Sequence, residues 1–181
     1  MRDADSMFAS VLAGPSGRVY SFGDAALAGW ADDGGMLWPT RVPHVDGDTL
    51  RAWAELSYPA LCAAILKLFV TDADADFSHS DVDGMVSEAF AAFGTAHVVE
   101  VADLGLNMHV AELWHGPTLA FKDLGMAVLG RTLSHLLRKR QRRLTLLVGT
   151  SGDTGSSAIE AVRGLPSIEI VVLYPLQTLA T

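Results

Sequence analysis

The sequence predicts an α/β fold in which a helical amino-terminal domain precedes the start of an α/β lobe with a parallel sheet. Apolar residues repeat at helical spacing over residues 57–69 and 81–93, whereas strand-length apolar runs alternate with helical patterns after residue 97. Strand, helix and strand in this order are typical of a parallel sheet, because parallel strands need a crossover between them. We therefore expect three parts, namely a flexible leader (1–17), a helical domain (18–95) and a partial catalytic lobe (96–181).

Local signals place the elements of the first part. Asp24 lies in a short helix predicted over residues 22–29, and Asp32–Gly35 is expected to form a tight turn. A polar loop over residues 44–48 follows. Ser57-Tyr58-Pro59 places proline in the first turn of the next helix, a position that proline favours.

The second part alternates strands and helices within one predicted α/β sheet. Residues 144–148 are a continuous apolar run, which is typical of a strand buried on both faces of a parallel sheet. The expected elements are strands over 98–101 and 108–113, a helix over 123–140, the strand over 144–148, a turn over 149–154, a helix over 155–163 and a buried strand over 168–173.

Composition excludes several classes of protein. Half of the 181 residues are hydrophobic, which is enough to build a core, and the net charge of -8 argues against nucleic-acid binding. The basic run over 138–143 is interpreted as a solvated helix end, where cations complement the helix dipole. The apolar run over 61–70 is too short to span a bilayer, and Asp3 and Asp5 stand where a signal peptide would be basic. We expect a cytoplasmic protein without a membrane partner.

Cysteine and histidine do not indicate a metal or redox site. The single cysteine, Cys62, lies in an apolar helical run and is interpreted as a small core residue. Five of the histidines show no metal-ligand spacing, so we predict no metal.

Lys122 is the first candidate catalytic residue. It is one of three lysines, and it follows a predicted strand where a helix begins. Phe121 and Leu124 would partly desolvate its amine, which favours the neutral form that attacks an aldehyde to give a Schiff base. The residues alone leave an alternative open, in which Lys122 pairs with Asp123 or another carboxylate on a surface turn.

The second candidate is the glycine-rich segment 149–155, between a strand and a helix. Backbone N–H groups at a helix start, with glycines that allow close approach, form an anion site for a carboxylate or a phosphate. A tight connection without a ligand is an equally common use of such a turn. Nucleotide binding is the weaker interpretation, since the glycine spacing is not G-x-G-x-x-G and Tyr174-Pro175 replaces the acidic residue a ribose requires.

Four segments together resemble the threonine synthase family. Residues 112–123 resemble its lysine segment, residues 150–155 the segment that follows, and residues 31–39 and 56–59 two amino-terminal motifs. The resemblance covers about residues 18–175. It implies a fold-type II enzyme dependent on pyridoxal 5'-phosphate (PLP), with a helical amino-terminal domain followed by α/β lobes around the cofactor.

The resemblance also implies the roles of individual residues. Lys122 would bind PLP covalently and later transfer a proton, and Asp153 would lie near the ring oxygen of the cofactor. Thr150, Ser151, Gly152 and Thr154 would hold the substrate carboxylate. His115 precedes Gly116 in the lysine segment and is a further possible site residue, with a structural hydrogen bond to the backbone as its alternative.

The implied activity is that of a carbon-oxygen lyase acting on O-phospho-L-homoserine, which loses phosphate to give threonine or 2-oxobutyrate. Family members are more than twice as long, and the loop that grips the PLP phosphate would follow residue 181, so Leu176–Thr181 is interpreted as a truncated end. The alternative is a catalytically inactive fragment that acts as a binding or structural module. The oligomeric state is left open.

Overall fold

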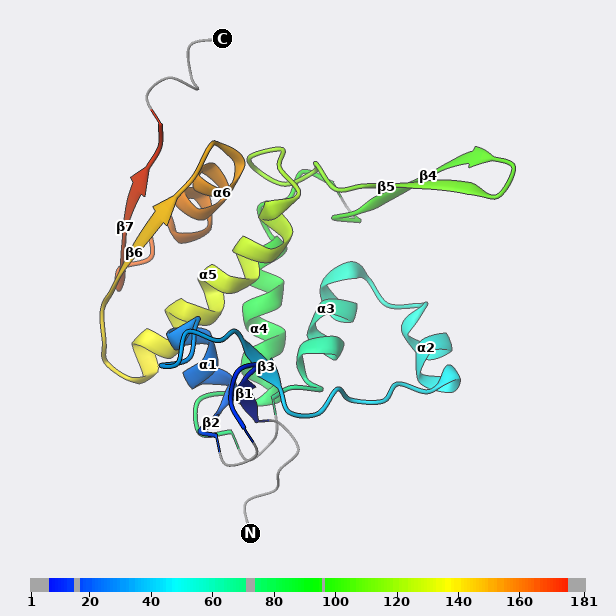
Figure 1. The fold of residues 1–181 in the computed structure, drawn as a ribbon. Coiled ribbons are helices and arrows are strands. Elements are labelled where there is room, and N and C mark those ends of the chain that lie inside the picture. The colour runs from blue at the N-terminus through cyan, green and yellow to red at the C-terminus, as the bar shows by residue number, and fades with distance from the viewer. Residues whose placement is uncertain (1–6, 15–16, 71–73, 96, 176–181) are drawn as a thin grey trace. The chain divides into compact units, whose positions relative to one another are not determined.

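The computed structural model describes residues 7–14, 17–70, 74–95 and 97–175 (Figure 1). The chain divides into two compact units, residues 1–84 and 85–181, and each is described by itself. Helix α4 (His79–Phe90) crosses the boundary between them. The predicted domain limits of 18–95 and 96–181 stay a prediction. No helix among the described residues is long and apolar enough to cross a membrane.

Unit 1 combines short helices with a small antiparallel sheet. The three strands pair in the order β2-β1-β3, and Phe8 of β1 lies opposite Tyr20 and Pro39. The elements are β1 (Phe8–Ser10), β2 (Val19–Tyr20), α1 (Phe22–Ala28), β3 (Leu37–Pro39), α2 (Gly47–Trp53), α3 (Tyr58–Leu66) and the start of α4.

Two features of unit 1 differ from the sequence prediction. Residues 8–10 were expected in a flexible leader but form β1, the central strand of the sheet. Residues 1–6 and 15–16 of that leader lie outside the described residues. The predicted polar loop over 44–48 contains the start of α2, whose cap is Asp46. Strands of two or three residues and a seven-residue helix are too short to produce a periodic apolar pattern.

Side-chain caps begin the helices of unit 1. The hydroxyl oxygen of Ser21 accepts from the Asp24 N–H at 3.1 Å, and that of Ser57 accepts from the Ala60 N–H at 3.4 Å. Each cap satisfies one of the donors that a helix start leaves unpaired. The predicted helices over 22–29 and from Ser57 onward are therefore confirmed, as is the tight turn, where the Gly34 N–H donates to the Ala31 carbonyl.

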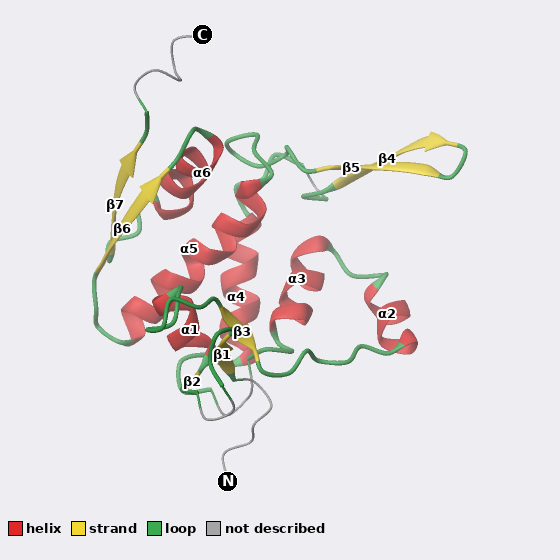
Figure 2. Cartoon of the chain, in the orientation of Figure 1, coloured by secondary structure: helices red, strands yellow, loops and turns green. Residues whose placement is uncertain are grey.

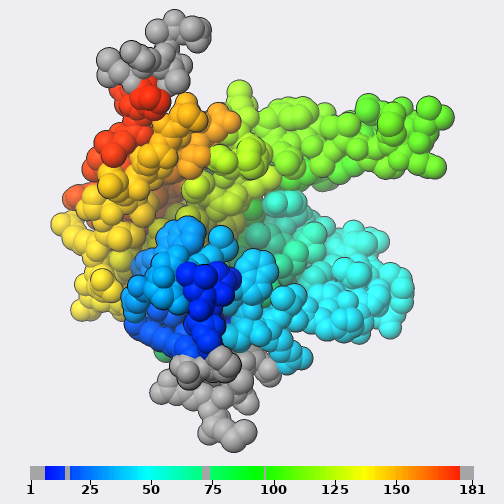
Figure 3. Space-filling model, in the orientation of Figure 1, coloured from blue at the N-terminus to red at the C-terminus, as the bar shows by residue number. Residues whose placement is uncertain are grey.

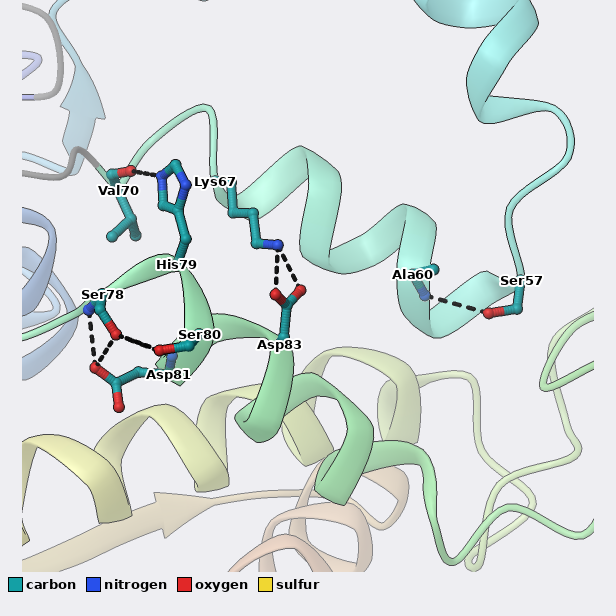
Figure 4. Close-up of polar contacts among 9 residues, drawn as sticks. All are labelled: Ser57, Ala60, Lys67, Val70, Ser78, His79, Ser80, Asp81 and Asp83. Atoms are coloured by element: carbon teal, nitrogen blue, oxygen red, sulfur yellow. Dashed lines mark hydrogen bonds and ion pairs between the residues drawn. The ribbon is translucent and has the colours of Figure 1, made fainter.

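Polar contacts join α3 to the start of α4 (Figure 4). Lys67, which follows α3, donates to the carboxylate of Asp83 at 2.6 Å, and His79 Nε2 donates to the Val70 carbonyl at 3.1 Å. The Asp83 side chain is 57% exposed, so the ion pair stabilises unit 1 by at most about 1 kcal/mol. Buried side chains of unit 1, such as Val70 and Phe77, therefore provide most of its stability.

Unit 2 contains a parallel strand pair, a separate antiparallel hairpin and two packed helices (Figure 2). Strands β6 and β7 pair in parallel from Leu144 opposite Ile168 to Gly149 opposite Leu173. The elements are β4 (Glu100–Gly105), β5 (Met108–Glu112), α5 (Lys122–Lys139), β6 (Leu144–Gly149), α6 (Asp153–Val162) and β7 (Ile168–Leu173). Leu133, Leu136 and Leu137 of α5 are buried.

The strands of unit 2 differ from prediction in four ways. Strand β4 covers residues 100–105 where a strand over 98–101 was expected, and β7, which was expected to be buried, has exposed residues at every second position. The predicted single sheet is two sheets, because β4 and β5 pair only with each other, and their atoms extend from unit 2 as an arm (Figure 3). The strand over 144–148 was expected to be buried on both faces, but β6 alternates between exposed and partly buried residues. One face of the pair packs on α6, and on the other Leu147 remains 69% exposed.

A glycine in α5 allows the close approach of α6. A Cβ atom at Gly130 would lie 2.4 Å from the Ala161 carbonyl oxygen, whereas a Cβ atom at Gly125 would meet nothing within 4 Å. The α5–α6 contact therefore requires glycine at position 130 but not at position 125.

We predict that Gly130→Ala lowers the free energy of unfolding by about 1–3 kcal/mol, because the helix backbones must separate. The matched control Gly125→Ala should raise it by about 0.5–1 kcal/mol, since alanine is the better helix former. Urea unfolding followed by circular dichroism measures both. Equal effects of the two substitutions would contradict the assigned packing.

Candidate functional site

Lys122 lies at the end of a tightly closed segment, residues 116–123, which we term the lysine turn. Within it the Leu119 N–H donates to the Gly116 carbonyl at 3.1 Å, and the Asp123 N–H donates to the Ala120 carbonyl at 3.0 Å. Leu119 has a positive φ of 61°, a conformation that costs a non-glycine residue about 1–2 kcal/mol. Other contacts must therefore hold the turn.

Asp123 supplies these contacts. Its side chain is buried, and its carboxylate accepts from the Thr118 backbone N–H at 2.8 Å and from the Thr118 hydroxyl at 2.6 Å. A buried carboxylate requires such donors, because transfer of a charge from water is costly. The alternative pairing of Lys122 with Asp123 is not found. The two side chains are adjacent on α5 and point in different directions, as helix geometry requires.

Lys122 is the first residue of α5 and is half-buried. Its amine nitrogen lies 4.4 Å from the centroid of the Phe121 ring. This placement agrees with the expected partial desolvation by Phe121. In the described part of the chain no carboxylate pairs with Lys122, so its amine has no competing partner.

A hydrogen bond joins the lysine turn to α6. The Thr118 hydroxyl lies 3.0 Å from the hydroxyl of Ser157, which is almost completely buried in α6. The glycine-rich segment begins that same helix, and α5 and α6 start at the same end of unit 2 (Figure 1). The two segments that the sequence singled out are thus physically connected.

The glycine-rich segment is shaped by Thr150. Its hydroxyl oxygen accepts from the N–H groups of Gly152 and Gly155, each at 3.0 Å, and its own N–H donates to the Leu173 carbonyl at 2.9 Å. The first N–H groups of a helix have no partner inside the helix, so those of Asp153 and Thr154 remain donors. The segment has the donors that an anion requires.

A cavity of about 380 Å³ lies beside this segment, where the strands β6 and β7 end. Four of the predicted site residues line it, and the other lining residues give it an apolar wall. The lining residues are Thr150, Ser151, Gly152, Asp153, Gly155, Ser156, Ile159, Val172 and Tyr174. Ligands of α/β sheets bind at the carboxyl ends of the strands, which is where this cavity lies.

His115 has a defined partner outside this cavity. Its Nε2 lies 2.8 Å from a carboxylate oxygen of Glu112, the last residue of β5, and both side chains are largely buried. Its ring also contacts Trp114 at 5.7 Å between centroids. The His115 side chain therefore has a structural hydrogen bond, but its partner is the Glu112 carboxylate and not the backbone that was expected.

The structure brings some of the predicted site residues together and leaves others apart. Thr150, Ser151, Gly152 and Asp153 line one cavity, whereas Lys122, His115 and Thr154 are not among its lining residues. Sequence reasoning missed Thr118, Ser157 and the cavity wall formed by Ile159, Val172 and Tyr174. A serine on the buried face of α6, beside Ala158, was the available signal for Ser157.

Neither a metal cluster nor a reactive thiol stands out. Among the described residues no three His, Cys, Asp or Glu side chains are grouped to hold a metal ion. Burial raises the pKa of the Cys62 thiol, which disfavours the thiolate.

The amino-terminal part matches a known family model. Residues 14–90 match the model described as threonine synthase N terminus. Among curated proteins, threonine synthase-like 2 of Rattus norvegicus is 40% identical over 155 residues, which are 86% of this chain and 32% of that protein. Threonine synthase of Pseudomonas aeruginosa is 38% identical with the same coverage. The chain thus spans about a third of the length of these relatives.

Solved structures agree over nearly the whole chain. The PLP-bound threonine synthase of Brucella melitensis superposes with a TM-score of 0.85 at 37% identity, covering 93% of this chain and 35% of the other. The yeast threonine synthase gives 0.89 at 29% identity, covering 97% and 36%. These similarities confirm the predicted fold class, a helical amino-terminal domain followed by the start of a fold-type II PLP-dependent lobe.

Gly155 provides a test of the glycine-rich segment. A Cβ atom there would lie 2.4 Å from Cγ2 of Thr150, so Gly155→Ala must displace Thr150 and break its two contacts with backbone N–H groups. We predict a loss of about 1–3 kcal/mol in unfolding free energy and faster amide exchange at Gly152. Gly149→Ala is the control, since a Cβ atom there meets nothing within 4 Å. An equally stable Gly155→Ala would refute the role of Thr150.

Proposed function

Because this chain belongs to the threonine synthase family, as its amino-terminal portion, we propose that it carries the cofactor lysine of a PLP-dependent carbon-oxygen lyase. Lys122 is that lysine, and Asp153 lies beside the cofactor ring. The substrate is a small molecule, O-phospho-L-homoserine. Its carboxylate is held by Thr150, Ser151, Gly152 and Thr154.

The observation that carries the proposal is the connection between the two helix starts. Thr118, four residues before Lys122, is hydrogen-bonded to Ser157, five residues after Gly152. The lysine turn and the donors of the glycine-rich segment therefore belong to one hydrogen-bonded assembly at one end of unit 2. A lysine that holds an aldehyde and a loop that holds a carboxylate are required together by amino-acid chemistry on PLP.

The residues around Lys122 are suited to hold PLP. The Lys122 amine is half-buried and lies over an aromatic ring, and Asp123, the nearest carboxylate in sequence, is occupied by Thr118. The N–H groups of Asp153 and Thr154 are available to an anion.

Each residue then has one task. PLP, when bound, draws electrons away from the α-carbon of an amino acid and so eases removal of its proton. The Lys122 amine accepts that proton and returns it, a general base and acid of the kind that lysine provides when desolvated. The glycine-rich segment would orient the substrate carboxylate by backbone N–H donation, and Asp153 would hold the cofactor near its ring oxygen.

The product is either threonine, when water adds after loss of phosphate, or 2-oxobutyrate and ammonia, when loss of phosphate is followed by hydrolytic release of the amino group. The two kinds of relative do not decide between them, because threonine synthase-like 2 of rat is 40% identical and the Pseudomonas aeruginosa threonine synthase 38%. Loss of phosphate from O-phospho-L-homoserine is common to both outcomes.

We predict that PLP followed by borohydride labels Lys122 at least about tenfold more than Lys67 or Lys139, a preference of about 1.4 kcal/mol. The preference arises because Lys122 is half-buried over Phe121 while Lys67 is paired with Asp83. Peptide mass analysis of the purified chain locates and quantifies the phosphopyridoxyl label.

Lys122→Ala should abolish the dominant label, and the matched control Lys139→Ala should retain it. Label spread evenly over the three lysines would reject Lys122 as a preformed cofactor residue in this chain. That outcome would favour the alternative of a binding or structural module.

A further inference from the structure

The residues that hold the lysine turn differ from those that reach a ligand. We propose that Asp123 and Thr118 are positioning residues, whose paired hydrogen bonds fix the lysine turn so that the Lys122 amine stays against the Phe121 ring. The proposal rests on the proposed function for its chemical meaning. It adds to that function the two side chains that set the place of the amine.

The paired contacts are made by a carboxylate with almost no access to water. Asp123 is 2% exposed, and both of its oxygens accept from Thr118, one from the backbone N–H at 2.8 Å and one from the hydroxyl at 2.6 Å. Hydrogen bonds to an ionised acceptor are shorter and stronger than neutral ones. Two bonds between the same two residues also restrain their relative orientation, as a single bond would not.

These hydrogen bonds offset backbone strain at Leu119. Leu119 follows Thr118 directly, has a φ of 61° and is 72% exposed. A leucine in this left-handed region is strained, and its exposed side chain gains no burial in return. The turn is thus maintained by the contacts on either side of Leu119, of which the Thr118–Asp123 pair is the strongest.

Close packing leaves the turn little room to relax. A Cβ atom at Gly116 would lie 2.4 Å from a carboxylate oxygen of Asp123, so the backbone passes directly over that carboxylate. Ser157, 1% exposed, fixes the Thr118 hydroxyl from the side of α6 at 3.0 Å. Because Lys122 is adjacent to Asp123, any shift of the carboxylate moves the backbone that carries the amine.

The Phe121 ring provides a readout that needs no cofactor. Protons above an aromatic ring resonate upfield, and the Lys122 amine nitrogen lies 4.4 Å from the ring centroid. In the full chain labelled at lysine only three side chains contribute signals, which Lys122→Arg assigns. We expect the Lys122 ε-methylene protons upfield of those of Lys67 and Lys139, and Phe121→Leu should abolish that shift.

Thr118→Val removes the hydroxyl and keeps the shape and the backbone donor, so we predict that most of the upfield shift is lost. Thr118→Ser keeps the hydroxyl and should keep the shift, a rescue that a purely steric role would not give. Labelling of Lys122 by PLP and borohydride, relative to Lys139, should fall roughly threefold to tenfold in Thr118→Val, the effect of one lost hydrogen bond.

Two further results keep the test decisive. If Thr118→Val unfolds the chain, Ser157→Ala replaces it, since it removes only the 3.0 Å contact with Thr118 and should reduce the shift in part. An unchanged shift in the folded variant, or no upfield shift in the parent chain, overturns the proposal. Absence of PLP label on Lys122 together with the expected shifts would reject the proposed function and leave the positioning role standing.

Discussion

The buried carboxylate of Asp123 is the constraint on which the candidate site depends. A charge with 2% exposure is tolerated only with good donors, and Thr118 supplies both of them. Removing a donor from a buried acceptor costs about 1–3 kcal/mol, and more when the acceptor is charged. This energy is comparable with the strain at Leu119. The hydrogen bonds of the Asp123 carboxylate therefore hold the lysine turn in place. The hydrogen bond between Thr118 and Ser157 links that turn to α6.

The placement of Lys122 explains why it differs from the other lysines. Lys139 ends α5 within a basic run, where a cation complements the helix dipole, and Lys67 is paired with Asp83. Lys122 instead begins a helix, the end at which a positive charge is unfavourable, with an aromatic ring as its neighbour. A helix start, partial burial and the lack of a carboxylate partner among the described residues together set Lys122 apart from the other two lysines. No single one of them would distinguish this lysine.

Sequence reasoning succeeded where the signal is local. Ser57 with Pro59 marks the start of α3, and the apolar run from Leu144 marks β6. It failed where pairing is distant, as for β1, whose partners β2 and β3 follow after separate turns. Burial of β6 was overestimated because a run of apolar residues does not reveal how many neighbours a strand has. The orientation of the Asp123 side chain could not be predicted from the sequence. It depends on a hydrogen bond to Thr118 across a turn in which Leu119 has a positive φ.

The lysine turn and the glycine-rich segment differ in how many contacts hold them in place. Lys122 is held in place by contacts within residues 116–123 and by Ser157. All of these residues belong to the described part of unit 2. The sheet beneath the glycine-rich segment has two described strands, and Leu147, Val171 and Leu173 on its outer face stay 48–69% exposed. A strand pair of this kind depends on α6 for its stability. Because the lysine turn is held by buried hydrogen bonds while this sheet keeps an exposed face, we expect the amine to be positioned more firmly than the glycine-rich segment.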